Sequence, residues 1–316
     1  MFNENPESVL KQSIQPSFEE AGTPEAERPR VIDQLRALKS AELTELKIKG
    51  LEDYDVLRLD ITDKELWESP DEARKLVPAF GKMAYEVYGS QGKRAPYDPS
   101  NQEMVEASLQ DDIVDGDISL ADKMFIVAKG DKVAGFLVLS FEELNETEKT
   151  AYVPLTIVDP EHRGEKLSKE LYRMAFAVEG ISAFTGFSAR PEAVKNRLEI
   201  GKEFGFTGFY AGYKDGQFGE MGTPEEQAKV KELTDLAMGE AETAKEKKRR
   251  KETPYGYVVY DKSVNPIAPI TESDLKFEAG DPLGRTFREG LLPVQEKFSP
   301  HTVYGALINI KNPEQS

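Results

Sequence analysis

The chain has 316 residues, of which 39% are hydrophobic, with no cysteine and a formal net charge of −17, a composition that allows one large domain or a smaller core with additions. The negative charge excludes general binding to nucleic acid, whose phosphates attract Lys and Arg, and the missing cysteines exclude disulfides and thiolate nucleophiles. The first residues lack the pattern of a signal peptide and no apolar run approaches the ~20 residues that cross a bilayer, so we expect a cytoplasmic protein without membrane contact.

The N-terminal part predicts an arm, a helix and then the first strand of a compact domain. Residues 1–29 are rich in Glu, Pro, Ser and Asn, which is typical of a surface arm. Apolar residues recur at helical intervals over 30–49, and Gly50 would end that helix. From 54 to 62 the apolar residues alternate with polar ones, the period of a half-buried strand.

The next segment predicts two helices and an acidic loop. Apolar residues follow one stripe over 71–88, and a weaker helix is predicted at 101–109. The loop 111–117 (DDIVDGD) carries four aspartates, which suggests calcium as one interpretation. It lacks the ligand spacing and the final Glu of an EF-hand, so a solvated turn is favoured and no metal is expected.

A hairpin and a strand–loop–helix unit follow. Apolar runs at 124–128 and 133–139 flank a Lys-Gly-Asp-Lys turn, which predicts a hairpin. A strand is predicted at 150–158, a helix at 165–178 and another strand at 181–187.

The remaining elements are a helix and three strands around a charged insertion. A helix is predicted from Pro191 to Phe204, followed by an aromatic strand at 206–213. A capping box at Thr223 begins a helix that becomes wholly charged toward residue 251, and two strands are predicted at 255–260 and 302–310. We expect the first of these to pair with 206–213.

The strand–loop–helix unit predicts an anion-binding turn. The apolar strand ends at Asp159-Pro160, and Arg163 and Gly164 precede the helix. The first amides of a helix have no intrahelical partner and lie at the positive end of its dipole. The turn therefore suits the phosphates of a cofactor.

The same turn carries a family resemblance. It reads Val158-Asp159-Pro160-Glu161-His162-Arg163-Gly164, then Glu165-Lys166-Leu167-Ser168. This resembles the GNAT superfamily of acyl-CoA N-acyltransferases, where Val-x-Pro-x-x-Arg-Gly-x-Gly-x-Gly or -Ala is typical. Phe204-Gly205-Phe206 is similar to the closing Leu-Gly-Phe of that family. The resemblance implies an α/β fold with a mixed, mostly antiparallel central sheet and flanking helices at 53–262. An arm and helix at 1–52, a charged insertion at about 215–253 and a C-terminal extension at 263–316 fall outside it.

The resemblance implies that acetyl-CoA binds as the acyl donor. Its pyrophosphate would lie on the residues around the turn, with Lys169 and Arg173 free to favour phosphate. Pro154, which cannot donate a ladder hydrogen bond, fits a bulge where two parallel strands separate to admit the pantetheine arm. The implied cofactor contacts are Arg163, Gly164, Lys166, Leu167 and Ser168 in the turn, and the main chain of Ile157 and Val158.

Three positions depart from the family. Lys166 replaces the middle glycine of the turn, where its side chain either crowds the phosphates or adds a positive charge. Gly201 and Thr150 stand where the family often has a Tyr acid and a Glu base. Other residues close enough to replace them are Glu148 or Glu143, as a base acting through water, and Tyr152 or Tyr210, as an acid.

The resulting hypothesis is an N-acyltransferase that uses direct attack by a primary amine in a ternary complex. The acidic composition favours a cationic acceptor, either a small molecule or a lysine side chain. The alternative is a degenerate member that keeps the fold as a binding or structural module. In either case the extensions are candidates for contacts with a partner or within a homo-oligomer.

Overall fold

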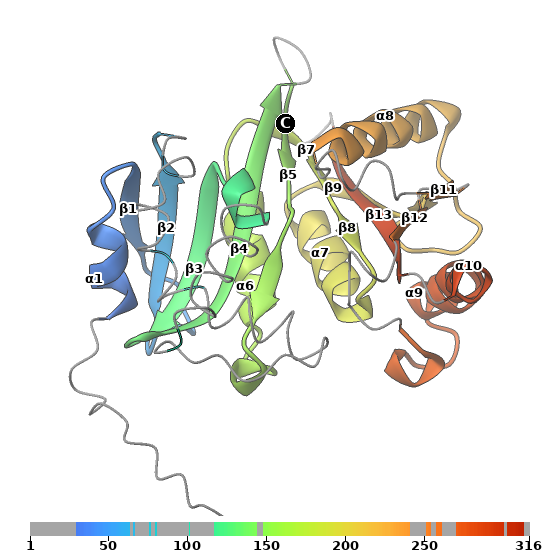
Figure 1. Cartoon of the computed structure of the whole chain (residues 1–316). Coiled ribbons are helices and arrows are strands. Elements are labelled where there is room, and N and C mark those ends of the chain that lie inside the picture. Colours follow the sequence, from blue (N-terminus) through green and yellow to red (C-terminus); the bar gives the residue numbers. More distant parts are fainter. Residues whose placement is uncertain are drawn as a thin grey trace, which may run out of the picture.

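A computed structural model shows a mixed α/β fold built on one mostly antiparallel sheet with helices on both faces, as predicted (Figure 1). The described residues are 30–63, 66, 76, 80, 101, 117–143, 148–240, 251–253, 257–260, 270–299 and 302–312. The strands are β1 (Ala41–Leu46), β2 (Asp55–Ile61), β3 (Lys123–Lys129), β4 (Lys132–Glu143), β5 (Lys149–Tyr152), β6 (Thr156–Val158), β7 (Ile181–Thr185), β8 (Phe187–Ser188), β9 (Phe206–Tyr210), β10 (Tyr213–Lys214), β11 (Lys251–Thr253), β12 (Tyr257–Tyr260) and β13 (Thr302–Lys311). The helices are α1 (Val31–Arg36), α6 (Leu167–Phe176), α7 (Pro191–Glu203), α8 (Pro224–Glu240), α9 (Pro282–Arg285) and α10 (Leu292–Phe298), with short turns η4 (Asp117–Leu120), η5 (Pro160–His162), η6 (Glu272–Asp274) and η7 (Thr286–Leu291).

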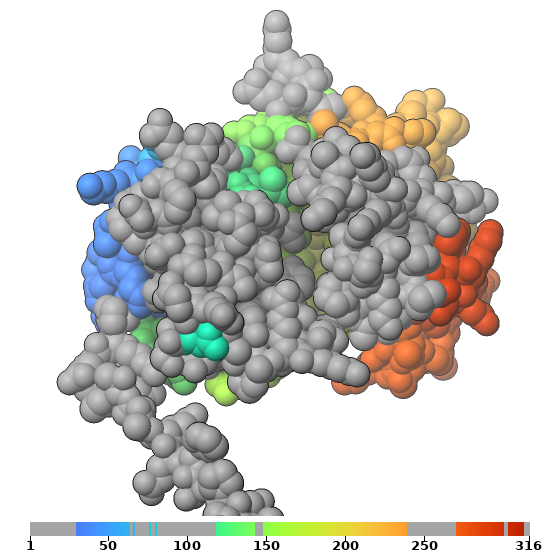
Figure 2. All heavy atoms as spheres, viewed as in Figure 1, coloured from blue at the N-terminus to red at the C-terminus, as the bar shows by residue number. Residues whose placement is uncertain are grey.

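The sheet runs in the order β1-β2-β3-β4-β5-β7-β13-β12-β11. The β5–β7 pair is parallel, and the other pairs along this path are antiparallel, including β7–β13, where Phe184 lies opposite Asn309. Figure 2 shows the N-terminal elements at one lateral edge of the molecule and the C-terminal helices at the other. The parallel pair therefore lies in the middle of the sheet, flanked by antiparallel strands.

The helices cover the two faces of the sheet differently. Val194 of α7 shares a buried cluster with Tyr210 and Leu307, whereas Leu233 of α8 packs with Phe209 and Ile308. Because neighbouring residues of a strand point to opposite faces, α7 and α8 lie on opposite sides of β9 and β13. Helix α6 packs beside α7, with six buried side chains toward the sheet.

The parallel strands separate in the middle of the sheet. β5 pairs with β7 from Lys149 to Tyr152, and the Val153 amide donates to the Thr185 carbonyl at 2.9 Å. Beyond that point β6 pairs with β4, and β8 pairs with β13. On β4, Leu137 and Ser140 are three residues apart, while their partners Thr156 and Tyr152 are four apart. The extra residue is a bulge around Pro154, so the predicted separation of the strands is confirmed.

Two sequence-based expectations for the elements were wrong. The segment 30–49 forms α1 and then strand β1, because its second half pairs with β2 over six residues, and such tertiary pairing overrides a helical apolar pattern. Strand β12 pairs with β13 and not with 206–213, because β13 lies between them and pairs with both β9 and β12. Residues 302–311 are thus part of the central sheet.

Other expectations are confirmed or lie outside the described residues. The hairpin, the helix at 191–204 and the helix start at Thr223 match β3–β4, α7 and α8. The predicted helices at 71–88 and 101–109, most of the acidic loop and the basic run before Lys251 fall outside the described part of the chain. No helix among the described residues has the length and apolar character to cross a membrane.

The separation of the strands depends on Gly186. A Cβ atom at this position would lie 2.8 Å from Nη1 of Arg197 and 2.9 Å from the carbonyl oxygen of Val153. We predict that Gly186→Ala lowers the free energy of unfolding by about 1–3 kcal/mol, because main chain has to move to admit the methyl group. Denaturant unfolding would measure the loss. Gly219→Ala is the control for backbone strain, since Gly219 also has a positive φ (+89°) but no atom lies within 4 Å of its Cβ position. Gly186→Ala should lose more than this control, and an equal loss in both variants would contradict the steric part of the prediction.

Candidate functional site

The turn between β6 and α6 presents free amides at a helix N-terminus. The Asp159 side chain accepts a hydrogen bond from the Glu161 amide at 2.8 Å and starts the turn η5. Gly164 has φ +94°, and α6 begins at Leu167. In the described part of the chain, no partner accepts from the amides of Gly164, Lys166, Leu167 or Ser168. The turn is therefore equipped for an anion as predicted.

Lys166 adopts the backbone conformation of a glycine. It is the N-cap of α6, with φ 63° and ψ 13° in the left-handed region, and its side chain is exposed. A side chain in this region costs roughly 1–2 kcal/mol. The turn thus has the main-chain path that the family motif builds with glycine, and the lysine side chain extends into solvent from it.

Tyr54 holds the turn against the start of β2. Its hydroxyl donates to the Glu165 carboxylate and lies 3.0 Å from Nδ1 of His162. Burial and the neighbouring Glu165 raise the pKa of Tyr54 to about 12, and the hydrogen bond from Tyr54 lowers the pKa of Glu165. Nδ1 of His162 also lies 3.3 Å from the Glu165 carboxylate, so the histidine is part of the same cluster.

The cations of α6 are not free, contrary to the sequence-based expectation. Lys169 contacts Glu199 at 2.6 Å, and Arg173 contacts Glu203 at 3.1 Å as well as Glu170. The reason is that α7 lies beside α6 and presents carboxylates to it. Arg163 and Lys166, by contrast, are exposed and have no ion pair within the described residues, so both cations remain available at the turn.

On β6 the free main-chain groups are those of Thr156 and Val158, whereas the sequence predicted Ile157 and Val158. The Val138 amide donates to the Leu155 carbonyl, and the Asp159 amide donates to the Ala134 carbonyl, both at 2.9 Å. Since antiparallel residues alternate in direction, Ile157 between them faces its partner Phe136 on β4. The main-chain groups of Thr156 and Val158 therefore face the space where β7 has moved away. Val158 was predicted for this role and Thr156 was not.

The predicted catalytic side chains lie at different distances from the point of separation. Tyr152 is 6% exposed and directly precedes Val153. It points away from α6, because Ala151 and Val153 on either side of it pack with that helix. Glu148 contacts Lys229 of α8 at 2.9 Å and precedes β5, about 16 Å from Val153 along the strand.

Two further candidates do not enter the site. Glu143 ends β4, and its side chain lies outside the described residues. Tyr210 is fully buried and donates to the carbonyl of Ser188 at 2.9 Å, and its ring stacks on Phe287. Its contacts stabilise the sheet beneath the C-terminal helices.

A buried arginine at the separation was missed. Arg197 of α7 is 2% exposed and donates through Nε to Oδ1 of Asn309 at 2.9 Å. Burial lowers the pKa of its guanidinium to about 10, while Tyr172 and Tyr152 act in the opposite direction. The signal was present in the sequence, because Val194, Arg197 and Ile200 share the apolar stripe of α7.

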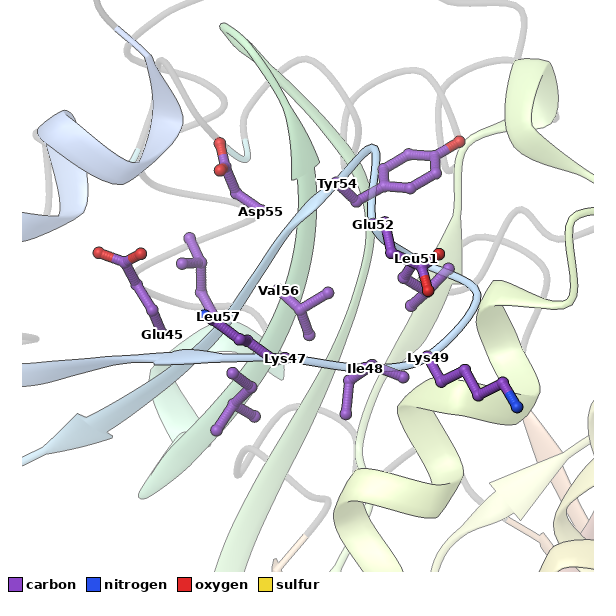
Figure 3. A pocket seen from close by; sticks show the side chains of 11 residues that line it. Glu45, Lys47, Ile48, Lys49, Leu51, Glu52, Tyr54, Asp55, Val56 and Leu57 are labelled. Carbon is purple, nitrogen blue, oxygen red and sulfur yellow. The ribbon is translucent and has the colours of Figure 1, made fainter.

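Two surface hollows are lined by neither Arg163 nor Arg197. One of about 460 Å³ lies on the β1–β2 hairpin, and another of about 670 Å³ lies at the C-terminal end of α6. Figure 3 shows Glu45 and Asp55 on one side of the first hollow and Lys49 on the other. Its charges are mixed, so it is no anion site. Within the described residues no group of three or more His, Asp or Glu side chains is placed to hold a metal ion.

Comparisons with known proteins find similarity to solved structures alone, at low identity. No protein-family model and no curated protein sequence matches the chain. Several solved structures to which the chain is similar are acetyltransferases. One is diaminobutyrate acetyltransferase EctA from Paenibacillus lautus with its substrate and coenzyme A (14% identity, 42% of this chain, 76% of that chain, TM-score 0.29). Another is Naa50 from Arabidopsis thaliana with a bisubstrate analogue (12% identity, 55% of this chain, 89% of that chain, TM-score 0.24).

A third similar structure is an integron cassette protein of V. cholerae (17% identity, 39% of this chain, TM-score 0.27), of which this chain spans 65%. At these scores the resemblance says nothing about activity or the roles of residues. The case for a site rests on the strand order, the separation of β6 from β7 and the turn before α6.

The left-handed Lys166 gives a stability prediction. We expect Lys166→Gly to raise the free energy of unfolding by about 0.5–1 kcal/mol, because the strain it removes exceeds the extra chain entropy of glycine. Chemical denaturation would measure this gain. Lys195→Gly, on the exposed side of α7, is the control and should lose about 1 kcal/mol. Destabilisation of both variants would show that Lys166 is not strained.

Proposed function

We propose that this protein is an acyl-CoA-dependent N-acyltransferase that transfers an acetyl group to a primary amine by direct attack in a ternary complex. One observation carries the proposal. A helix N-terminus with unpartnered amides lies at the end of a strand whose own outward main-chain groups are left free by the separation of β6 from β7. An extended ligand with an anionic end and amide groups along its length matches this arrangement.

The proposed contacts lie along acetyl-CoA, from its pyrophosphate at the turn to its thioester inside the sheet. The pyrophosphate lies on the amides of Gly164, Lys166, Leu167 and Ser168, with Arg163 adding a charge-assisted contact. The amides of the pantetheine arm pair with the main chain of Thr156 and Val158, as an added strand would. The thioester then lies near Val153 and Gly186, where β5 and β7 begin to separate.

The two faces of the sheet have different roles in transfer. The acyl donor enters on the face of α6 and α7, and the amine approaches from the other face, where Tyr152 points. Attack by the neutral amine forms the C–N bond, the C–S bond breaks, and the amine loses a proton. Glu148 or Glu143 receives that proton through ordered water, since the strand separates Glu148 from the thioester by about 16 Å. The charge of −17 favours a cationic acceptor.

A degenerate binding module is the second candidate. The pairs Lys169–Glu199 and Arg173–Glu203 join α6 to α7, and Asn196 donates to the Ser168 hydroxyl at 2.8 Å. These contacts hold closed the space between the helices beside the turn. In a module without activity they would be permanent, whereas in an enzyme they would open when acyl-CoA binds.

Binding of acetyl-CoA tests the turn. We predict that Arg163→Glu weakens binding at least tenfold in isothermal calorimetry, because it removes one cation and adds an anion beside a pyrophosphate. Lys202→Glu, an equal charge change at an exposed site near the end of α7, should keep the wild-type affinity. Absence of binding to the wild type at millimolar acetyl-CoA would refute the proposed function, and equal affinities of the two variants would place the ligand elsewhere.

Turnover tests Tyr152. With an amine panel and detection of released CoA, Tyr152→Phe should lower kcat at least tenfold with a small change in the KM for acetyl-CoA, because its hydroxyl assists proton transfer near the thioester. Tyr210→Phe is the matched control, since it also removes a buried phenol hydroxyl, one that bonds the carbonyl of Ser188. It should lose about 1 kcal/mol of stability and keep its kcat. Equal kcat in both variants would exclude a role for Tyr152, and binding without any turnover in the wild type would favour the module.

A further inference from the structure

Arg197 is a buried cation without a carboxylate partner in the described part of the chain. The residue is 2% exposed, and its Nε atom donates a hydrogen bond to the neutral amide of Asn309. Its Nη2 atom has no hydrogen-bond partner. A buried charge is costly unless an opposite charge and hydrogen bonds offset its lost hydration. Among the described residues, the larger part of this cost is therefore not compensated.

The guanidinium lies where the parallel strands begin to separate. Nη1 of Arg197 and the carbonyl oxygen of Val153 lie 2.8 and 2.9 Å from the Cβ position of Gly186, so all three groups meet at one point. Thr156, on the arm of the sheet that β6 forms, is near Tyr172 of α6, and Tyr172 acts electrostatically on Arg197. The cation is thus enclosed by β5, β6, α6, α7 and β13.

Donors without partners gather around this point. Besides Nη2 of Arg197, the buried Nδ2 atom of Asn309, whose Oδ1 accepts from Arg197, has no hydrogen-bond partner. Both atoms are donors only. A full positive charge with unused donors complements an atom that is negatively charged, or one that becomes so during a reaction.

Resting on the proposed function, we propose that Arg197 is a catalytic residue that pairs with the sulfur of coenzyme A as it leaves. An arm bound along Thr156 and Val158 brings its thioester to the guanidinium. When the amine nitrogen bonds to the carbonyl carbon, the electron pair of the broken C–S bond stays on sulfur as a thiolate, which Arg197 stabilises. The proton lost by the amine passes through water to Glu148 or Glu143, and the thiolate is protonated in solution after release. On α7, the charge of Arg197 would thus take the place of a proton donor, because Gly201 has no side chain to donate a proton.

The first test uses the wild-type protein and two ligands. Free CoA has a thiol that ionises near pH 8.5, whereas S-methyl-CoA has the same arm without an ionising group. If Arg197 pairs with the thiolate, the affinity for CoA rises about tenfold between pH 7 and 9, and the affinity for S-methyl-CoA stays constant. Arg197 remains protonated throughout, and the titratable groups that act on it, Tyr172 and Tyr152, are phenols, with the pKa of Tyr172 raised by burial.

The second test changes the cation. Arg197→Met should remove the pH dependence of CoA affinity, retain binding of S-methyl-CoA, and lower kcat by about 10²–10³-fold with a small change in KM. Arg197→Lys, which restores a charge, should recover part of both effects. Thermal melting of each variant reports folding, and the wild-type comparison of the two ligands stands if a variant does not fold.

Three outcomes overturn the proposal. Parallel pH profiles for CoA and S-methyl-CoA in the wild type show that no group of the protein recognises the thiolate. A wild-type preference for succinyl-CoA over acetyl-CoA that Arg197→Met abolishes assigns the cation to a carboxylate of the acyl group. If neither CoA nor S-methyl-CoA binds, the proposed function itself fails, and this role of Arg197 fails with it.

Discussion

The missing amide hydrogen of Pro154 is the constraint on which the rest of the site depends. A proline cannot complete a ladder, and the bulge around it lets β6 follow β4 while β7 and β8 turn toward β13. Each feature of the proposed site depends on this separation of β6 from β7. The free main chain of Thr156 and Val158, the close contact at Gly186 and the enclosed position of Arg197 exist because two parallel strands pair for four residues and then part.

The turn before α6 completes the arrangement from the other end. Its unpartnered amides lie where β6 ends, and Tyr54 fixes the turn to the neighbouring strand through Glu165 and His162. In the proposed site these amides and the exposed Arg163 and Lys166 attract the anion, while Glu165 and the carboxylates of α7 limit the positive charge around the turn. Specific geometry therefore has to contribute more to binding than net charge, which is negative for the chain as a whole.

The sequence predicted the parts of the fold whose signals are local. Alternation, turn residues and capping located the hairpin, α7 and the start of α8, and the motif around Arg163 located the turn. It failed where pairing is remote: β1 became a strand because β2 lies beside it, and β13 entered the sheet between β7 and β12. In the site, the main chain of Thr156 faces away from β4 and that of Ile157 faces toward it. Which of the two faces away depends on the position of the bulge, and the sequence indicated that position only to within a few residues. Arg197 was missed because one charged residue on an apolar stripe is usually attributed to the surface.

The place of β13 has a consequence for how the protein assembles. One arm of the separated strands, β7 with β8, is held in place by a strand far downstream, which also supplies Asn309 to the guanidinium of Arg197. During synthesis, β3, β4, β5 and the turn before α6 emerge long before this strand does, so the surroundings of Arg197 are complete only after β13 has joined the sheet. Contacts of such long sequence separation slow folding. In a nascent chain, the proposed phosphate-binding turn therefore forms before the proposed reactive end.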